Sequence, residues 1–550
     1  MMAKRLITLI FLFSFLFIGL TGKAFYEQII MGPSHVKRSL SIRTIDFPGE
    51  EFIRGDILDR NGISLTDTAI RPTLVVYPRL IENPQEIATK IKDIKIKDIE
   101  PYYRNNVKIY PSPFFIHINE NNINYLSIVK EINSPGLTIL PIKTRYGPNA
   151  LAEHIIGYIG YPPNGSQQKG LKGIEGIFDE ELRGSTPEKI ITPILDARNN
   201  VLSGLGYRSI NLAKDLSRSD IYLTIDSRIQ KISEDVFDSQ GIIQGGVVVL
   251  DIETGNILAA VSRPSFDQNN PNKNMLGYNN QLERVIDYRV YPGSIYKVIT
   301  AAAALEAGIV TPETKFYCEG FSEDFHVTCP RPHGELTFTD AMARSCNVTF
   351  VKVGLELGRE KLEEYMIEKF GFTPVKNKAL DSKSARANGI IGQEIFATSP
   401  LEIANMMATI ARGGYHQKIV NPWQTRLVQA IGSRENVDLI TEVPQFELIY
   451  NQETAQSLQN MLTATNQWGS GSRAWIEGYG SAGKTGTPQS SVPHEYYAWY
   501  AGYAPIDSPK YAIAVLVEEK AYLSKSNLQG GAIAGPIFKE IMESILKNFY

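Results

Sequence analysis

The chain has 550 residues, of which 43% are hydrophobic and 21% are charged; this is an ordinary globular composition, and the length suits two or more domains. A formal net charge of −3 gives no reason to expect a nucleic-acid partner. The three cysteines are too few for a disulfide framework, although Cys318 and Cys329 could either pair in an oxidising compartment or stay free, and Cys346 would remain single. No Cys-x-x-Cys motif or histidine-rich run indicates a metal site, and no cofactor is expected.

An apolar run over residues 6–22 follows Lys4 and Arg5 and precedes Lys23. A cleaved signal peptide has a shorter apolar run of about 7–15 residues and small residues at the cut, whereas a membrane-spanning helix needs about 17–25 residues. Lys23 interrupts the small residues that cleavage would require, so the sequence favours an uncleaved anchor. The two basic residues predict that residues 1–5 stay in the cytoplasm and that everything after Lys23 lies outside.

The rest of the chain falls into two regions that differ in composition and in predicted secondary structure. Residues 23–215 mix short apolar stretches with Pro, Asn and Gly, which indicates a loop-rich region of mixed α/β structure. From residue 216 onward, strand-like runs alternate with helical patterns, and the run Glu253-Thr254-Gly255-Asn256 predicts a hairpin. The strand-like runs cover 221–226, 246–252, 257–262, 496–503 and 511–517, and helical patterns start at Ser227 and cover 533–546. Strands from both ends of 216–550, with helices between them, predict an α/β domain.

The most informative local feature is Ser294, which follows Pro292-Gly293 and precedes an alanine-rich stretch closed by Gly308. Pro-Gly ends the preceding segment and alanine favours a helix, so Ser294 is expected at a helix N-terminus. Lys297 lies three residues further on and projects from the same face. A serine hydroxyl becomes a good nucleophile when a neighbouring base takes its proton, and Lys297 could be that base if burial or nearby cations lower its pKa.

The Ser-x-x-Lys spacing alone identifies nothing, because five other pairs in the chain share it. Two further motifs downstream of Ser294, in a fixed order, single it out: Ser345-Cys346-Asn347 and Lys484-Thr485-Gly486-Thr487. Ser345 offers a hydroxyl that can relay a proton, and Asn347 offers an amide that can hold a peptide bond. The second motif offers a fixed positive charge at Lys484, two hydroxyl donors for an anionic group, and a glycine that permits close approach of a substrate backbone.

This ordered trio is the signature of penicillin-binding proteins and serine β-lactamases. The resemblance extends to the stretch 245–259, which is similar to the strand pair that opens a penicillin-binding transpeptidase domain. In the N-terminal half, the stretches 54–62, 153–160 and 173–179, the last together with 182–184, resemble motifs of the class B, monofunctional penicillin-binding proteins. One departure is Glu283, where many relatives have Asn before an Arg, and it lies outside the three motifs.

The resemblance implies a transpeptidase domain with an antiparallel sheet flanked by helices over 216–550, an N-terminal dimerisation or pedestal domain over 23–215, and one transmembrane helix over 6–22. It implies a D,D-transpeptidase in which Ser294 attacks the penultimate D-Ala of a D-Ala-D-Ala stem peptide and a neighbouring stem amine takes the acyl group; a β-lactam would acylate the same serine. Backbone N–H groups of Ser294 and Thr487 would form the oxyanion hole. The implied catalytic residues are Ser294, Lys297, Ser345 and Lys484, and the implied substrate-binding residues are Asn347, Thr485, Gly486 and Thr487.

Five other functions share parts of this pattern. A D,D-carboxypeptidase or β-lactamase would use water as acceptor, but neither needs the long N-terminal region, and no Glu-x-x-Leu-Asn follows Ser345. A β-lactam sensor would carry several spans and a His-Glu-x-x-His metalloprotease motif, which the chain lacks. A catalytically inactive scaffold is disfavoured by the intact trio, and a bifunctional glycosyltransferase-transpeptidase by the class B motifs.

The resemblance further implies a single-pass protein of the bacterial cytoplasmic membrane, with its catalytic domain outside and a polytopic glycan polymerase as partner. The sequence leaves open whether the enzyme serves elongation, division or sporulation, and which stem-peptide residue and acceptor it uses.

Overall fold

The computed structural model describes most of the chain and separates it into two compact units. The described residues are 2–31, 54–104, 107–111, 114–118, 122–162, 168–184, 189–193, 207–211, 217–271, 280–323, 327–375, 380–433, 436–439, 444–488, 495–520 and 529–550. The first unit comprises 1–54, 69–144 and 184–217, and the second comprises 55–68, 145–183 and 218–550. The domain boundary predicted at 215/216 lies outside the described residues and stays a prediction.

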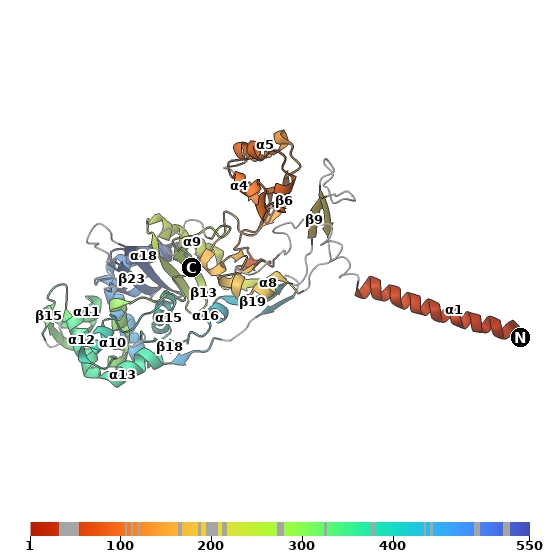
Figure 1. The fold of residues 1–550 in the computed structure, drawn as a ribbon. Helices are drawn as coiled ribbons and strands as arrows, with labels where there is room; N and C mark the ends of the chain where they lie inside the picture. Colours follow the sequence, from red (N-terminus) through yellow and green to blue (C-terminus); the bar gives the residue numbers. More distant parts are fainter. Residues whose placement is uncertain are drawn as a thin grey trace. The chain divides into compact units, whose positions relative to one another are not determined.

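The first unit contains an N-terminal helix and a small mixed α/β fold. Its central sheet has the order β5-β2-β6, with both outer strands antiparallel to β2, and buried Leu74, Val76, Ile87 and Ile91 pack in one cluster. The elements of this unit are α1 (Met2–Phe25), η1 (Tyr26–Ile30), β2 (Ala69–Val76), η2 (Pro78–Leu80), α3 (Pro84–Lys90), α4 (Ile96–Ile99), β3 (Tyr102–Arg104), β4 (Val107–Ile109), β5 (Phe114–His117), α5 (Tyr125–Ile132), β6 (Leu137–Thr144), β9 (Lys189–Pro193) and β10 (Tyr207–Asn211) (Figure 1).

Helix α1 covers the apolar run over 6–22, and the side chains of residues 11–28 are exposed. Within the part of the chain that the structure describes, no helix is both long enough and apolar enough to cross a membrane. The transmembrane helix expected over 6–22 is therefore not confirmed.

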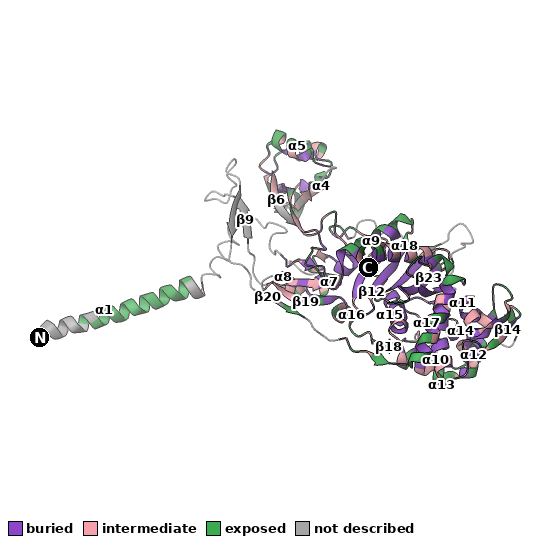
Figure 2. Ribbon diagram, turned by 180° about the vertical axis from the view of Figure 1, so that it is seen from behind, coloured by how far each residue is buried: buried purple, intermediate pink, exposed green. Residues whose placement is uncertain are grey.

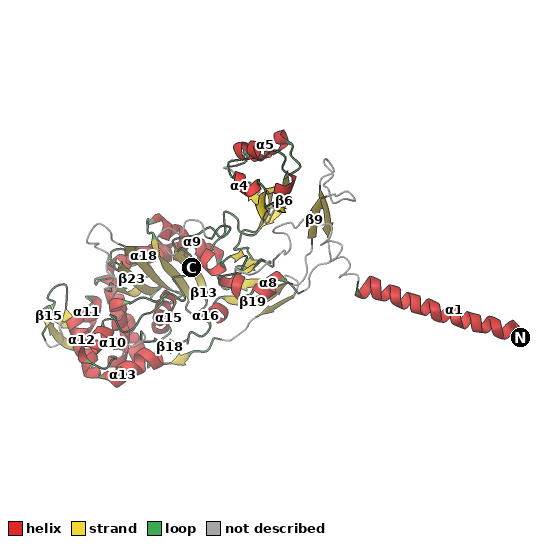
Figure 3. Cartoon of the chain, in the orientation of Figure 1, coloured by secondary structure: helices red, strands yellow, loops and turns green. Residues whose placement is uncertain are grey.

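The second unit is built on a five-stranded antiparallel sheet with the order β13-β12-β24-β23-β22 (Figure 3). The sheet elements and the helices on its two faces are α9 (Ser227–Ser239), β12 (Gln244–Asp251), β13 (Ile257–Arg263), α15 (Pro400–Ala411), β22 (Ala482–Gly486), β23 (Glu495–Ala504), β24 (Tyr511–Lys520) and α18 (Ala534–Phe549). Strands from the two ends of the sequence lie side by side, because β12 pairs with β24 along its whole length. The strands expected over 246–252, 257–262, 496–503 and 511–517 and the helix over 533–546 are confirmed.

Alternation along the strands explains why both faces of this sheet are covered. In β12, Val247 and Val249 pack in the cluster that contains α18 residues, whereas Val248 and Leu250 pack in the larger cluster that contains α15 residues. Successive side chains of a strand point to opposite faces, so an apolar residue at every position requires a partner on each side. Figure 2 shows the resulting concentration of buried residues in the sheet and in the helices packed on it.

The strand expected over 221–226 belongs to a different sheet. Strand β11 (Asp220–Leu223) pairs in parallel with β1 (Ile57–Leu58) and antiparallel with β19 (Val428–Ser433), which in turn pairs with β20 (Asn436–Leu439). The strand ends earlier than expected because Asp226 caps helix α9, accepting a hydrogen bond from the Arg228 N–H at 3.1 Å.

A helical region carrying small hairpins completes the second unit. Its elements are α6 (Glu153–Ile156), β7 (Ile159–Gly160), β8 (Lys169–Gly170), α7 (Gly173–Ile177), α8 (Asp179–Arg183), η3 (Gly293–Tyr296), α10 (Lys297–Glu306), β14 (Lys315–Cys318), β15 (Phe321–Ser322), β16 (Val327–Thr328), β17 (Gly334–Thr337), α11 (Phe338–Ala343), α12 (Asn347–Leu357), α13 (Arg359–Glu363), η4 (Glu364–Lys369), α14 (Lys383–Ile390), β18 (Tyr415–His416), α16 (Pro422–Thr425), β21 (Glu447–Leu448), α17 (Gln452–Gln467) and η5 (Ser472–Ala474).

Candidate active site

Ser294 lies where a helix begins, as the sequence predicts. The 3-10 turn η3 holds Ser294 and runs directly into α10, which starts at Lys297. Gly293 adopts φ +60°, a left-handed conformation that suits glycine, and Gly308 adopts φ +67° just beyond the end of the helix. Ser294 is partly exposed, whereas the Lys297 side chain is fully buried. The serine can therefore meet a ligand while the lysine is shielded from water.

The Lys297 ammonium is held by the Ser-x-Asn motif. Its Nζ donates to the Ser345 carbonyl oxygen at 2.7 Å, to the Ser345 Oγ at 3.2 Å and to the Asn347 Oδ1 at 2.6 Å. No hydrogen bond joins the Ser294 hydroxyl to Lys297, both of which lie in the described part of the chain. Burial lowers the pKa of Lys297 to about 8, so a neutral amine is accessible near physiological pH.

The Ser345 hydroxyl lies between two lysines. Besides its contact with Lys297, its Oγ accepts a hydrogen bond from the Lys484 Nζ at 3.0 Å. Ser345 adopts φ +56°, an uncommon conformation for a residue other than glycine. Residues 139 positions apart in sequence thus meet at one hydroxyl, which can exchange protons with either amine.

Lys484 is fully buried on strand β22. Burial first, and the positive charge of Lys297 second, lower the pKa of Lys484 well below its ordinary value. The positive charge expected at Lys484 therefore costs more free energy than it would at an exposed site, and an anion bound beside the amine would offset that cost.

The Asn347 amide is already engaged on both sides. Its Oδ1 accepts from Lys297, and its Nδ2 donates to the Thr328 carbonyl at 2.7 Å. One N–H hydrogen and one lone pair of the amide remain for a peptide bond. Thr328 was not among the residues singled out from the sequence.

Strand β22 passes very close to the turn that carries the serine. A methyl group added at Gly486 would lie 2.3 Å from the Pro292 carbonyl oxygen, and one added at Gly293 would lie 3.1 Å from the Thr487 backbone nitrogen. The Trp499 indole N–H donates to the Tyr291 carbonyl at 3.0 Å and fixes the approach to the turn. The backbone of Gly293, which directly precedes Ser294, and that of Thr487 are therefore neighbours, an arrangement compatible with an oxyanion hole.

The hydroxyls of the Lys-Thr-Gly-Thr motif have partners from two loops. Thr485 Oγ1 lies 3.1 Å from Ser470 Oγ, and Thr487 Oγ1 accepts from the Gly530 N–H at 3.1 Å. Sequence reasoning missed Ser470 and Trp499. The glycines that flank Ser470 signal a tight loop, but no local pattern shows what that loop approaches.

Glu283, the departure from the family pattern, binds backbone N–H groups. Its carboxylate accepts from the N–H groups of Val285 at 2.6 Å and Ile286 at 2.7 Å. Burial raises the pKa of Glu283 to about 7.

Two family models match the chain. The penicillin-binding protein transpeptidase domain matches residues 245–543, which is more than half of the chain and includes the whole site above. The penicillin-binding protein dimerisation domain matches residues 50–216. The chain belongs to the class B penicillin-binding proteins.

Relatives of this class B protein come from several bacteria. It is 28% identical to the stage V sporulation protein D of Bacillus subtilis, over 99% of this chain and 85% of the relative. It is 30% identical to the peptidoglycan D,D-transpeptidase PbpA of Mycolicibacterium smegmatis, over 68% of this chain and 82% of the relative. It is 24% identical to the peptidoglycan D,D-transpeptidase FtsI of Escherichia coli, over 96% of this chain and 89% of the relative.

Solved structures share the fold of this class B protein. A D,D-transpeptidase domain of a peptidoglycan glycosyltransferase from Eggerthella lenta superposes with a TM-score of 0.60 at 19% identity, covering 91% of this chain and 99% of the other. Penicillin binding protein 3 from Mycobacterium tuberculosis, complexed with aztreonam, superposes with a TM-score of 0.60 at 22% identity, covering 91% and 96%. The α/β transpeptidase fold expected from the sequence is confirmed.

Proposed function

We propose that the protein is a peptidoglycan D,D-transpeptidase that forms an acyl-enzyme on Ser294 and is acylated there by β-lactams. The observation that carries this function is the Ser345 hydroxyl, held at 3.2 Å from the Lys297 Nζ and 3.0 Å from the Lys484 Nζ, beside the turn that presents Ser294. Proteins that are similar over most of this chain bear the name peptidoglycan D,D-transpeptidase.

The reaction begins at the carbonyl of the penultimate D-Ala. Ser294 Oγ attacks that carbon while neutral Lys297 takes the hydroxyl proton, a role supported by the lowered pKa of Lys297. The developing oxyanion accepts hydrogen bonds from the backbone N–H groups of Ser294 and Thr487. Each such donor typically contributes about 3–4 kcal/mol to the transition state.

Collapse of the tetrahedral intermediate expels the terminal D-Ala. The proton taken by Lys297 passes through the Ser345 hydroxyl to the departing amine, since that hydroxyl contacts both lysines. The amine of a neighbouring stem peptide then attacks the ester carbonyl, and the proton that the amine loses returns to the departing Ser294 oxygen. The serine hydroxyl is restored, and an amide bond cross-links the two stem peptides.

The leaving residue carries a carboxylate, and the Lys-Thr-Gly-Thr motif is suited to bind it. Thr485 and Thr487 offer hydroxyls, and the bound anion favours the protonated form of Lys484 because it offsets the cost of a buried charge. Gly486 lets the substrate backbone approach the strand, and Asn347 holds the preceding peptide bond with its remaining N–H.

Mass spectrometry of the purified full-length chain after exposure to a penicillin tests this assignment. We expect one adduct on Ser294, absent in Ser294→Ala. Labelling at another residue would refute the site. Rapid turnover of the penicillin without a stable adduct would favour hydrolysis, as in a β-lactamase or D,D-carboxypeptidase, over transpeptidation.

We also propose that residues 6–22 anchor the protein in the cytoplasmic membrane, with residues 1–5 inside and the catalytic unit outside, and that a polytopic glycan polymerase is its membrane partner. The apolar composition of 6–22 behind Lys4 and Arg5 supports this arrangement. We expect detergent, but not alkaline carbonate, to release the protein from membranes. Release by alkaline carbonate would contradict the anchor.

A further inference from the structure

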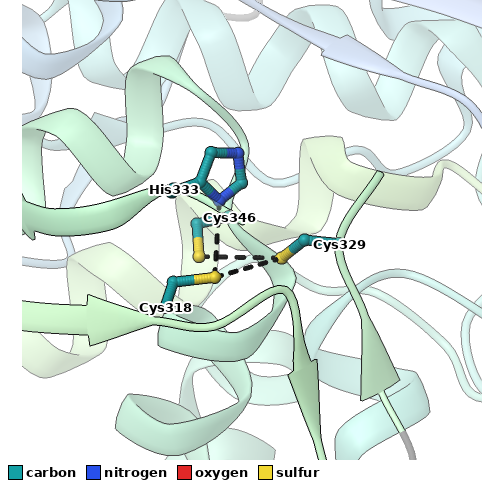
Figure 4. Close-up of side chains that lie close together, drawn as sticks. All are labelled: Cys318, Cys329, His333 and Cys346. Atoms are coloured by element: carbon teal, nitrogen blue, oxygen red, sulfur yellow. Dashed lines mark hydrogen bonds between the residues drawn. The ribbon is translucent and has the colours of Figure 1, made fainter. Parts of the chain in front are cut away.

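All three cysteines of the chain and one histidine meet in a single cluster beside the active site (Figure 4). Cys318 Sγ lies 3.8 Å from Cys329 Sγ and 3.5 Å from His333 Nδ1, and Cys329 Sγ lies 3.8 Å from Cys346 Sγ. All four donor atoms lie within 4.8 Å of one another. Cys318 and Cys346 are fully buried. The mechanism proposed above uses none of these four side chains.

These distances differ from those of a disulfide. Sulfur atoms in a disulfide are about 2.05 Å apart, and all three cysteines of the structure are free. Cys329 lies at the same distance from Cys318 and from Cys346, so a disulfide with either one would leave the other as a thiol. The open question of whether Cys318 and Cys329 pair is thus answered in favour of thiols.

Three of the six separations between the donor atoms fit a tetrahedral metal ion, and the other three are within 4.8 Å. With Zn–S bonds of about 2.3 Å and Zn–N bonds of about 2.0–2.1 Å, a regular tetrahedron places two sulfurs about 3.8 Å apart and a sulfur and a nitrogen about 3.6 Å apart. The observed separations of 3.8 Å, 3.8 Å and 3.5 Å agree with these values. Three thiolates and one imidazole are a ligand set typical of structural zinc sites.

The local fold holds the four ligands from separate elements. Cys318 ends β14, Cys329 follows β16, His333 precedes β17, and Cys346 caps the N-terminus of α12. Backbone hydrogen bonds fix this arrangement, because the Cys329 N–H donates to Gly320 at 2.8 Å and the His333 N–H donates to the Cys318 carbonyl at 3.1 Å.

Groups around the ligands also suit a metal-bound thiolate. The Thr349 N–H donates to Cys346 Sγ at 3.5 Å, and the Thr349 hydroxyl lies 3.2 Å from the same sulfur; such contacts orient and stabilise ligating sulfurs. Arg331, Arg344 and Lys297 all act electrostatically on His333. Positive charges at these three positions would offset the net negative charge of Zn²⁺ bound by three thiolates.

We propose that Cys318, Cys329, His333 and Cys346 bind one Zn²⁺ ion in a closed, structural site. All four positions are filled by the protein, so the ion has no open position for a substrate. The three thiols lose their protons on binding, and His333 binds through Nδ1 in its neutral form.

The site positions the Ser-x-Asn motif for catalysis. Cys346 stands between Ser345 and Asn347, and Asn347 donates to the Thr328 carbonyl, next to Cys329 in sequence. The ion therefore ties β14, β16 and β17 to the residues that hold Lys297. It also supports the left-handed backbone at Ser345, whose φ is +56°.

Metal analysis of the full-length chain, purified in detergent with a thiol reductant and without chelator, tests the proposal. We expect about one zinc ion per chain and, after replacement by Co²⁺, the visible spectrum of a tetrahedral cobalt thiolate. Cys329→Ser and His333→Asn should each lose most of the metal. Removal of zinc with a strong chelator should lower the thermal midpoint and slow penicillin acylation at least tenfold, and added Zn²⁺ should restore both.

Val327→Ala is the matched control, because Val327 is a buried neighbour on β16 that offers no ligand. It should lower stability slightly while keeping zinc and chelator sensitivity. The site is refuted if wild-type protein incubated with Zn²⁺ retains no more metal than the Cys329→Ser, His333→Asn double variant. Zinc that binds without changing acylation would refute the positioning role. Because metal content is measured independently of acylation, failure of this proposal is distinguishable from failure of the transpeptidase assignment.

Discussion

The pH dependence of Ser294 acylation tests Lys297 as the base. Lys297 is fully buried, and burial lowers its pKa from the ordinary 10.5 to about 8. At pH 7 about one tenth of the molecules then carry neutral Lys297, against about one in three thousand for a lysine of ordinary pKa. Since only the neutral amine can take a proton, we expect the acylation rate to rise about tenfold per pH unit below pH 8 and to level off above it.

The assay is single-turnover acylation by a fluorescent penicillin from about pH 6 to about pH 9.5. Lys297→Ala should slow acylation by about 10²–10⁴-fold and abolish the midpoint near 8, because the base is lost. Lys352→Ala, which changes an exposed lysine of α12, should leave both rate and profile unchanged. A profile that is flat between pH 6 and 8, or an unchanged rate in Lys297→Ala, would refute the base role.

Three further substitutions probe the neighbours of Ser294. Ser345→Ala removes the hydroxyl between the two lysines, so transpeptidation of a stem-peptide substrate should slow about a hundredfold. Gly486→Ala places a methyl 2.3 Å from the Pro292 carbonyl oxygen; the strand must move away from the helix start, and acylation should fall about a hundredfold. Trp499→Phe leaves the Tyr291 carbonyl without the indole donor at 3.0 Å, so the free energy of unfolding, measured by denaturant titration, should fall by about 1–3 kcal/mol.

Each of these variants has a control of the same residue type. Ser472→Ala changes an exposed serine, Gly535→Ala adds a methyl with no neighbouring atom nearer than 3.7 Å, and Trp468→Phe changes a tryptophan that is 48% exposed. All three should behave like the wild type. Equal losses in a variant and its control would mean that the effect is general rather than specific to the site.

Sequence alone predicted the parts of the fold that local patterns determine. The runs at 246–252 and 257–262 are apolar at successive positions and flank a Gly-Asn turn, and they form β12 and β13. The helix after Ser294 follows from Pro-Gly, an alanine-rich stretch and Gly308. These signals are sufficient to predict the elements because each signal depends only on residues that are close together in sequence.

The order of the three motifs can be read from the sequence, but the distances between their side chains cannot. Ser345 meets Lys484 because β22, at the edge of the five-stranded sheet, packs against the helical region. The same packing buries both lysines and lowers their pKa values, which the motifs by themselves do not indicate. Burial depends on the whole fold, and a motif cannot report it.

The cysteine cluster is the clearest example of a feature that only the tertiary structure decided. The spacing of Cys318, Cys329, His333 and Cys346 matches no familiar metal-binding pattern, and the sequence therefore indicated no site. Hairpin pairing of β14 with β17 and of β15 with β16 brings the first three together, and helix α12 supplies the fourth. Sequence predicted the nucleophile and determined the order of the motifs along the chain, whereas long-range strand pairing and packing decided which side chains lie within a few ångströms of one another.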